Sequence, residues 1–186
     1  MKRLETNYYT CQSKNDSQLK HQLSAWIARH HDEFTHAITF TFDERRVWHF
    51  IRASKQMTTP HDERMIELLR KTMFLFKRRI DRALYGNISK RHGTRLLFIP
   101  VLEGLSVGQF PHYHAVMSVD TERSRQLSDV VKSTWVKLPF AGHQIELVPY
   151  RDQGWLSYIT KGVLNLNQHS VDWESVSIPS RSLATC

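Results

Sequence analysis

Two histidines at positions two apart, His112 and His114, have the types and spacing best suited to binding a metal ion. They flank Tyr113 at the start of an apolar segment, HYHAVMSV, which predicts a β-strand over 112–119. Residues two apart on a strand share a face, so both imidazoles should point to one side of a sheet and Tyr113 to the other. The neutral imidazole is a common metal ligand.

A carboxylate lies upstream of this pair. Glu103 closes the apolar run LLFIPVLE, which predicts a strand over 96–103, and the connection 104–111 joins the two strands. Antiparallel pairing would bring Glu103 beside both imidazoles. Two imidazole nitrogens and one carboxylate oxygen make a three-ligand site with open positions, which a catalytic metal needs to hold a phosphate oxygen. The histidine pair without the carboxylate is more typical of a surface or hydrogen-bonded feature.

A second group of residues that could take part in a chemical reaction lies near the end of the chain. The segment Asp152 to Val163 predicts a helix, on which Tyr158 and Lys161 share one face. A tyrosine can be a covalent nucleophile toward a phosphodiester, but its pKa of about 10 means that it needs help at neutral pH. A nearby ammonium can favour the phenolate or neutralise charge that builds on the phosphate. The alternative is a helix tyrosine that packs its ring and leaves its hydroxyl at the surface.

The elements that must position these residues alternate between helices and strands. On a predicted central strand over 34–42, Ile38, Phe40 and Phe42 fall on one face, with Thr39 and Thr41 on the other. The other predicted elements are helices over 16–31, 61–84 and from 121 to before Pro139, a strand over 144–148, and a short strand or loop over 47–51. The chain divides into an N-terminal arm and helix (1–33), a core (34–163) and a polar C-terminal tail (164–186).

The charge of the chain is concentrated in one region. Lysines and arginines number 26 against 18 acids, which gives a net charge of +8 and favours a polyanionic partner such as nucleic acid. Nine of these cations lie between positions 70 and 95, against one acid, Asp81. We predict a phosphate-contacting surface there rather than an ordinary solvated face. Its predicted members are Lys71, Lys77, Arg78, Arg79, Arg82, Lys90 and Arg91.

The composition and motifs of the sequence also limit the other classes of protein to which the chain could belong. Two cysteines, Cys11 and Cys186, provide neither a disulfide framework nor a zinc pattern, and they suit a reducing cytoplasm. No apolar run approaches membrane-spanning length, and no signal peptide is recognisable. There is no GxxxxGK[ST] loop, so a helicase or ATPase activity would have to come from another chain.

Taken together, the motifs resemble those of the HUH endonucleases. His112-Tyr113-His114 resembles their His-hydrophobic-His motif, although Tyr113 is bulkier and more polar than the usual middle residue. Tyr158 to Lys161 resembles their YxxK motif, the segment 37–42 their first strand motif, and Glu103 the third metal ligand of viral-type members. A histidine strand that precedes a single tyrosine resembles the one-tyrosine rolling-circle replication initiators.

This resemblance implies an α+β fold, an RRM-like or ferredoxin-like sandwich with a mostly antiparallel five-stranded sheet flanked by helices. It implies that Tyr158 nicks single-stranded DNA at an origin, often in a hairpin, and keeps the 5′ end as a phosphotyrosine. Glu103, His112 and His114 would hold Mg²⁺ or Mn²⁺, and Lys161 would steady the phosphate or the phenolate. The implied partners are the origin DNA of a plasmid or phage and a host helicase, with no membrane.

Three alternatives stay open. A one-tyrosine HUH transposase would use the same chemistry, although YxxK with a lysine favours an initiator. A non-catalytic RRM-like module would bind nucleic acid without a metal and form no covalent adduct. A basic structural protein of a phage or plasmid would depend on Tyr158 and His112 for stability only.

Overall fold

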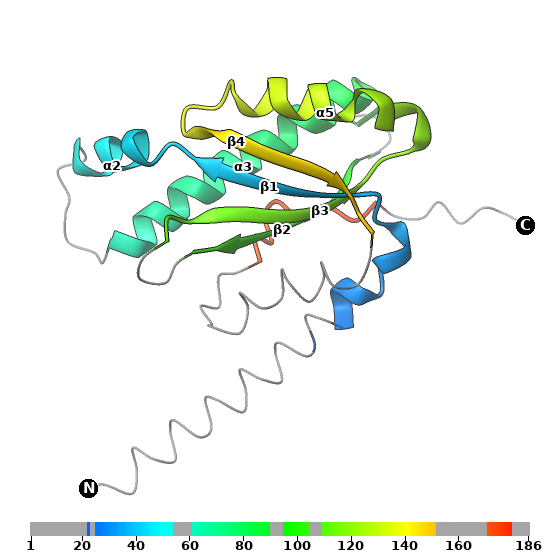
Figure 1. The fold of residues 1–186 in the computed structure, drawn as a ribbon, viewed down its shortest axis with the longest axis horizontal. Coiled ribbons are helices and arrows are strands. Elements are labelled where there is room, and N and C mark those ends of the chain that lie inside the picture. Colours follow the sequence, from blue (N-terminus) through cyan, green and yellow to red (C-terminus); the bar gives the residue numbers. More distant parts are fainter. Residues whose placement is uncertain are drawn as a thin grey trace, which may run out of the picture.

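Successive side chains along each strand point to opposite sides of the sheet, and the two faces that result are covered differently. The structure, a computed structural model, describes residues 22, 25–53, 61–89, 95–104, 109–151 and 171–179. Within these residues the sheet has four antiparallel strands in the spatial order β2-β3-β1-β4. Their bounds are β1 His36–Phe42, β2 Leu97–Glu103, β3 His112–Ser118 and β4 Ala141–Pro149 (Figure 1).

Helices connect the strands and cover one face of the sheet. Between β1 and β2 the chain forms α2 (Glu44–Ala53) and then α3 (His61–Tyr85), and α5 (Thr121–Trp135) joins β3 to β4. Helix α5 starts as the sequence predicts, because the Asp120 side chain accepts a hydrogen bond from the Arg123 backbone N–H at 2.9 Å. The helices α3 and α5 lie on the same side of the sheet (Figure 1).

The main core lies between these two helices and the sheet. Ile38, Phe40 and Phe42 of β1 point into it, as their predicted shared face requires, and each is at most 6% exposed. The Phe40 ring centroid lies 4.7 Å from that of Phe76 on α3 and 4.6 Å from that of Trp135 on α5. Aromatic packing at these separations fastens both helices to the central strand.

The opposite face of the sheet carries the two histidines, and we call it the histidine face. A smaller apolar cluster covers part of it: Ile27, Phe34, Leu97, Ile99 and Val116. Residues 25–28 are helical, and Ile27 is fully buried there, so the end of the predicted N-terminal helix packs against the sheet as expected. The 3₁₀ turn η1 (His31–Glu33) then leads the chain into β1.

One predicted element is wrong, and the correction changes the strand count. The segment 47–51 was expected to be a short strand or loop, but it lies inside helix α2, where Val47 and Ile51 are buried. These two residues are four apart and therefore fall on one side of a helix. The described part of the chain accordingly has four strands, not the five that were expected.

The segment Val171–Pro179 packs along the outer edge of β2, although it belongs to the predicted polar tail. The backbones of Ser177 and Phe98 exchange two hydrogen bonds, and the Asp172 N–H donates to the Pro100 carbonyl at 3.1 Å. Pro100 has no N–H to donate in return, which explains why the contact consists of isolated bridges instead of a regular fifth strand.

The Tyr113 side chain reaches this same segment. Tyr113 is fully buried, and its hydroxyl donates to the Asp172 carboxylate at 3.1 Å. The Ser175 hydroxyl donates to the same carboxylate oxygen at 3.0 Å. The polar middle residue of the histidine motif thus ties the C-terminal segment to the sheet, on the side away from the histidines.

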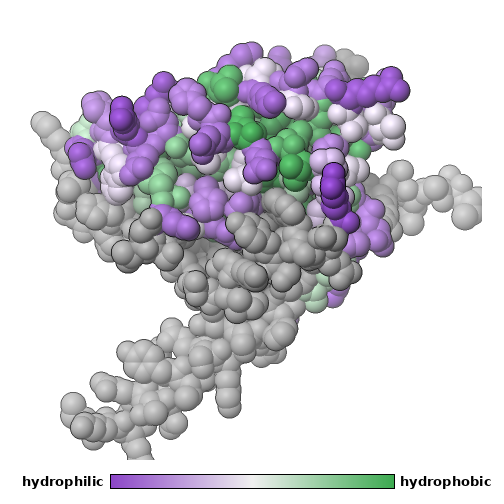
Figure 2. Space-filling model, viewed as in Figure 1, coloured by the Kyte–Doolittle hydropathy of each residue, from purple (hydrophilic) through white to green (hydrophobic). Residues whose placement is uncertain are grey.

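The surface is mostly hydrophilic where the view shows described residues, with apolar side chains gathered over the middle of the molecule (Figure 2). Among the described helices, none is both long enough and apolar enough to cross a membrane.

Candidate metal centre

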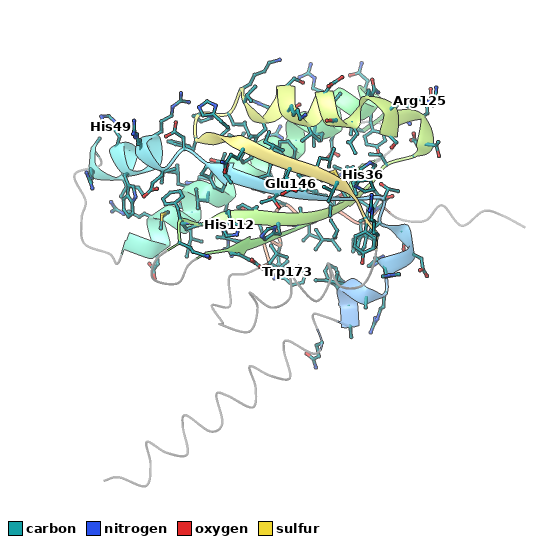
Figure 3. The ribbon with its side chains drawn as sticks, viewed as in Figure 1. His36, His49, His112, Arg125, Glu146 and Trp173 are labelled. Carbon is teal, nitrogen blue, oxygen red and sulfur yellow. The ribbon has the colours of Figure 1, made fainter. Side chains whose placement is uncertain are left out.

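The pairing of β2 with β3 brings the three predicted ligands together. Glu103 pairs directly with His112, and Val101 pairs with His114. Oε2 of Glu103 lies 3.5 Å from Nε2 of His114 and 3.9 Å from Nε2 of His112. Glu103, His112 and His114 therefore converge at the connected end of the β2–β3 hairpin, where Figure 3 labels His112.

The other ring nitrogen of each histidine is held by a hydrogen bond. The His112 Nδ1–H donates to the Phe110 carbonyl at 3.2 Å, because a carbonyl can only accept. Nδ1 of His114 lies 2.9 Å from the Thr39 hydroxyl of β1. Such contacts fix ring orientation and tautomer, and with Nδ1 protonated the Nε2 lone pair of each ring faces Glu103.

A divalent ion fits this set of donors. The three ligand atoms lie within 4.8 Å of one another. Two atoms bound about 2.1 Å from one ion are at most about 4.2 Å apart, and both separations from the Glu103 oxygen are shorter than that. A small inward movement of the histidines would complete the cluster, with coordination positions left for a substrate.

His114 is the more deeply placed of the two histidines. His114 is 5% exposed. Burial, and to a smaller extent the nearby His112, lowers the pKa of His114 from 6.5 to about 4. The ring planes of the two histidines are nearly perpendicular, with centroids 4.9 Å apart. His114 is therefore neutral at pH 7, which is the state that binds a metal.

This lowered pKa predicts a pH-dependent loss of stability. The unfolded chain protonates His114 as the pH falls through 6.5, whereas the folded protein resists protonation down to about pH 4. The free energy of unfolding should therefore fall over this window, by roughly 3 kcal/mol at its lower end. Urea unfolding in EDTA at pH 7 and pH 4.5 would show this fall in the wild type and a smaller one in His114→Gln. Equal pH dependence in both proteins would contradict the assignment.

Gly104 allows the chain to turn directly after Glu103. Its φ is +82°, in the left-handed region that favours glycine. A Cβ atom there would lie 2.8 Å from the Phe110 carbonyl oxygen and 3.1 Å from His112 Nδ1. Those two atoms form the hydrogen bond that orients His112, so Gly104 matters for the site as well as for the turn.

Replacing Gly104 with alanine should therefore weaken metal binding as well as the fold. We expect a loss of about 1–3 kcal/mol in the free energy of unfolding and at least a tenfold weaker affinity for Mn²⁺. Thermal unfolding and Mn²⁺ titration would measure the two effects. Gly86→Ala is the matched control, since Gly86 has φ +55° but nothing within 4 Å of an added Cβ. Equal Mn²⁺ affinities in the two variants would refute the role of Gly104.

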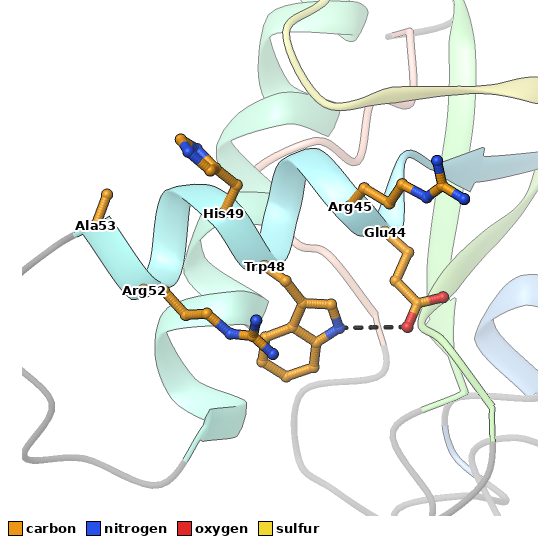
Figure 4. A pocket seen from close by; sticks show the side chains of 6 residues that line it. All are labelled: Glu44, Arg45, Trp48, His49, Arg52 and Ala53. Carbon is orange, nitrogen blue, oxygen red and sulfur yellow. Dashed lines mark hydrogen bonds between the residues drawn. The ribbon is translucent and has the colours of Figure 1, made fainter.

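Helix α2 contacts the segment that precedes β3. The Trp48 ring lies edge-on to the Phe110 ring at 6.4 Å, and its indole N–H donates to Glu44 at 3.3 Å. A hollow of about 670 Å³ opens on this helix, with Arg45, His49 and Arg52 among its lining residues (Figure 4). An aromatic ring with cations on either side suits a stacked base and its phosphates.

The predicted phosphate-contacting residues fall into different environments. Arg78 and Arg82 are exposed on α3. Arg79 is exposed but donates to the Lys137 carbonyl at 3.2 Å, and Lys71 pairs with Glu67. Lys90 and Arg91 lie outside the described residues.

Lys77 corrects the prediction. It is 5% exposed, and its ammonium lies 2.5 Å from the Asp81 carboxylate. Burial lowers the pKa of Lys77, while Asp81 opposes that change. A buried, paired ammonium is not presented to a phosphate, so Lys77 belongs to the interior and not to the exposed basic face.

Tyr158 and Lys161 also lie outside the described residues, but the residues on either side of that interval are informative. Tyr150 packs against the apolar cluster of the histidine face, with its ring 5.4 Å from that of Phe34. Val171 pairs with Val101, which stands beside His114 on the same face. The chain thus leaves the described fold and rejoins it on the histidine face.

Sequence reasoning missed two contributors to the site, Thr39 and Gly104. The threonine was assigned to the correct face of β1, but its contact with His114 depends on the β1–β3 register.

Comparisons with protein-family models, characterised proteins and solved structures find no match to this chain.

Proposed function

We propose that the protein is a metal-dependent endonuclease that nicks and rejoins single-stranded DNA through a phosphotyrosine, and that this reaction starts rolling-circle replication. The observation that carries the proposal is the convergence of Glu103, His112 and His114 beside one another at one end of the sheet. This arrangement supplies two imidazole nitrogens and one carboxylate oxygen, and we propose Mg²⁺ or Mn²⁺ as the ion.

The topology is compatible with this family of enzymes. The chain runs β-α-β-β-α-β, with α2 preceding α3 in the first crossover, and the sheet order β2-β3-β1-β4 is the ferredoxin-like and RRM-like plan. In such a plan two helices cover one face and leave the other for function. Here α3 and α5 cover one face, and the candidate ligands occupy the other.

In the proposed reaction the Tyr158 phenolate attacks the scissile phosphorus. The bond between phosphorus and the tyrosine oxygen forms while the bond to the 3′-oxygen breaks. The 3′-oxygen leaves, takes up a proton and becomes a primer hydroxyl, while the 5′-phosphate remains on Tyr158. Lys161 neutralises charge on the phosphate, and a bound ion would polarise its non-bridging oxygens. Attack by a 3′-hydroxyl on the phosphotyrosine reverses these steps and rejoins the strand without ATP.

The path of the chain supports this role for Tyr158. The interval 152–170 starts after Tyr150 and ends at Val171, and both of these residues pack on the histidine face. Both ends of the interval that contains Tyr158 are therefore attached on the side of the sheet that carries the candidate ligands. The hollow on α2 offers a further place for nucleotides.

The deciding experiment looks for a covalent protein–DNA adduct. The full chain would be mixed with randomised single-stranded DNA and Mn²⁺ and run on denaturing gels, with EDTA and Glu103→Gln as controls. We expect a protease-sensitive adduct that depends on the metal and on Glu103, and sequencing of rejoined ends would reveal the nicking site.

The alternative functions predict different results on these gels. A non-catalytic module binds the DNA without an adduct at any metal concentration, and that result with the protein's own origin DNA, supplied as a hairpin, would overturn the proposal. A transposase would form the same adduct but would join its own flanking repeat instead of a replication origin.

A further inference from the structure

A second groove lies on the helix-covered side of the sheet, away from the metal centre. It is about 690 Å³ and runs between α3 and the segment 174–177 at the edge of β2. The hydrogen bond from the Leu96 N–H to the Asp81 carboxylate, at 3.0 Å, fastens the start of β2 to α3 and places Arg95 beside the helix. Leu96 directly precedes β2 and Glu103 ends it, so roughly 20 Å of strand separates Leu96 from the metal centre.

The groove is positively charged because its internal acid is already neutralised. Asp81 accepts from both Lys77 and the Leu96 backbone. Arg78, Arg82 and Arg95 are exposed along the groove, and among the described residues no carboxylate lies within ion-pairing distance of them. Glu174 is the other acid in the lining. Three exposed guanidiniums favour a ligand with repeated negative charges.

The groove also presents apolar surface next to these cations. Phe74 is 37% exposed and Leu75 is 38% exposed, both on α3. The Arg78 guanidinium lies over the Phe74 ring, 5.8 Å from its centroid. Ser89 and Ser177 also line the groove. Aromatic and guanidinium planes stack on unpaired bases, which a duplex hides inside its own stack.

We propose that this groove is a second nucleic-acid site that holds single-stranded DNA away from the scissile phosphate. Phosphates would lie on Arg78, Arg82 and Arg95, and a base would stack on the Phe74–Arg78 pair. The choice of DNA rests on the proposed function, but the groove does not depend on the metal. Such a site would retain the displaced strand while the chemistry occurs at the other end of β2.

Binding of oligo-dT in EDTA tests the groove apart from any nicking. The triple variant Arg78→Ser, Arg82→Ser, Arg95→Ser should lower the slope of log affinity against log salt by about 2, since each lost phosphate contact to a single strand removes about 0.7. The matched control removes three exposed cations from α5 and the turn after it: Arg125→Ser, Lys132→Ser, Lys137→Ser. An equal change of slope in both triple variants would mean that the effect comes from net charge alone, and it would contradict the proposed site.

Phe74→Ala tests the stacking that distinguishes DNA from other polyanions. It should weaken oligo-dT binding at least about fivefold and leave heparin affinity unchanged within about twofold. Equal losses for both ligands, or no loss for oligo-dT, would remove the base-stacking role. Circular dichroism and thermal unfolding would verify that each variant is folded.

Failure of this site and failure of the nicking proposal give different results. A protein without nicking activity would still bind oligo-dT through the groove in EDTA. If only the groove assignment fails, the triple variant forms the Tyr158 adduct and binds oligo-dT with the same salt dependence as the wild type.

Discussion

Replacing Glu103 with glutamine should lower metal-dependent DNA cleavage at least 100-fold while the fold is retained. The substitution keeps the size of the side chain but removes the charge that faces both Nε2 atoms, at 3.5 Å from His114 and 3.9 Å from His112. Loss of an orienting contact alone costs about 10–100-fold in metal affinity or activity, and loss of an anionic ligand should cost more. Isothermal titration with Mn²⁺ and the rate of adduct formation would measure both consequences.

Glu146→Gln is the matched control for this experiment. Glu146 pairs with Thr39 across β1 and β4, so its side chain is on the histidine face, yet it is exposed and lies outside the candidate cluster. It should retain Mn²⁺ binding and cleavage close to the wild type. If Glu103→Gln binds Mn²⁺ as tightly as Glu146→Gln does, the ion is not held by Glu103.

The local pattern of the sequence was enough to predict the ligands and the pairing that joins them. His112 and His114 share a face because side chains alternate along a strand, and the short connection to Glu103 favours an antiparallel hairpin. The structure confirms this pairing, with Glu103 opposite His112. All of these relationships depend on residues close together in the chain.

Contacts that depend on distant pairing could not be predicted in the same way. Thr39 meets His114 because β1 pairs with β3, and a shift of one residue in register would put Thr39 on the other face. Helix α2 was missed because a short apolar segment such as 47–51 is compatible with either a strand or a helix.

The burial of Lys77 could have been predicted from the sequence, but the density of charge around this residue favoured the prediction of a surface position. On α3, Met73, Phe76 and Ile80 are buried at intervals of three and four residues, and Lys77 falls on the same stripe. Asp81, four residues further along, supplies the partner that makes this burial tolerable. A count of charges describes a surface only after residues on the buried stripe have been removed from it.

Replacing Tyr158 with phenylalanine should abolish both nicking and the covalent adduct. Phenylalanine keeps the ring but has no oxygen to attack phosphorus, so no phosphotyrosine can form. Metal affinity should stay unchanged because the candidate ligands come from β2 and β3. Denaturing gels with labelled single-stranded DNA would measure the adduct, and oligo-dT binding would show that the DNA surfaces are intact.

Tyr150→Phe separates this nucleophile from the nearest upstream tyrosine. The Tyr150 ring packs edge-on against Phe34 at 5.4 Å and against His31 at 5.7 Å, so a phenylalanine preserves those contacts. We expect Tyr150→Phe to form the adduct at a rate near that of the wild type. Should Tyr158→Phe keep the adduct and Tyr150→Phe lose it, the nucleophile would be Tyr150, and the role assigned to Lys161 would fall with Tyr158. Loss in both variants with Mn²⁺ binding preserved would mean that the Tyr150 hydroxyl helps to position the segment that carries the nucleophile.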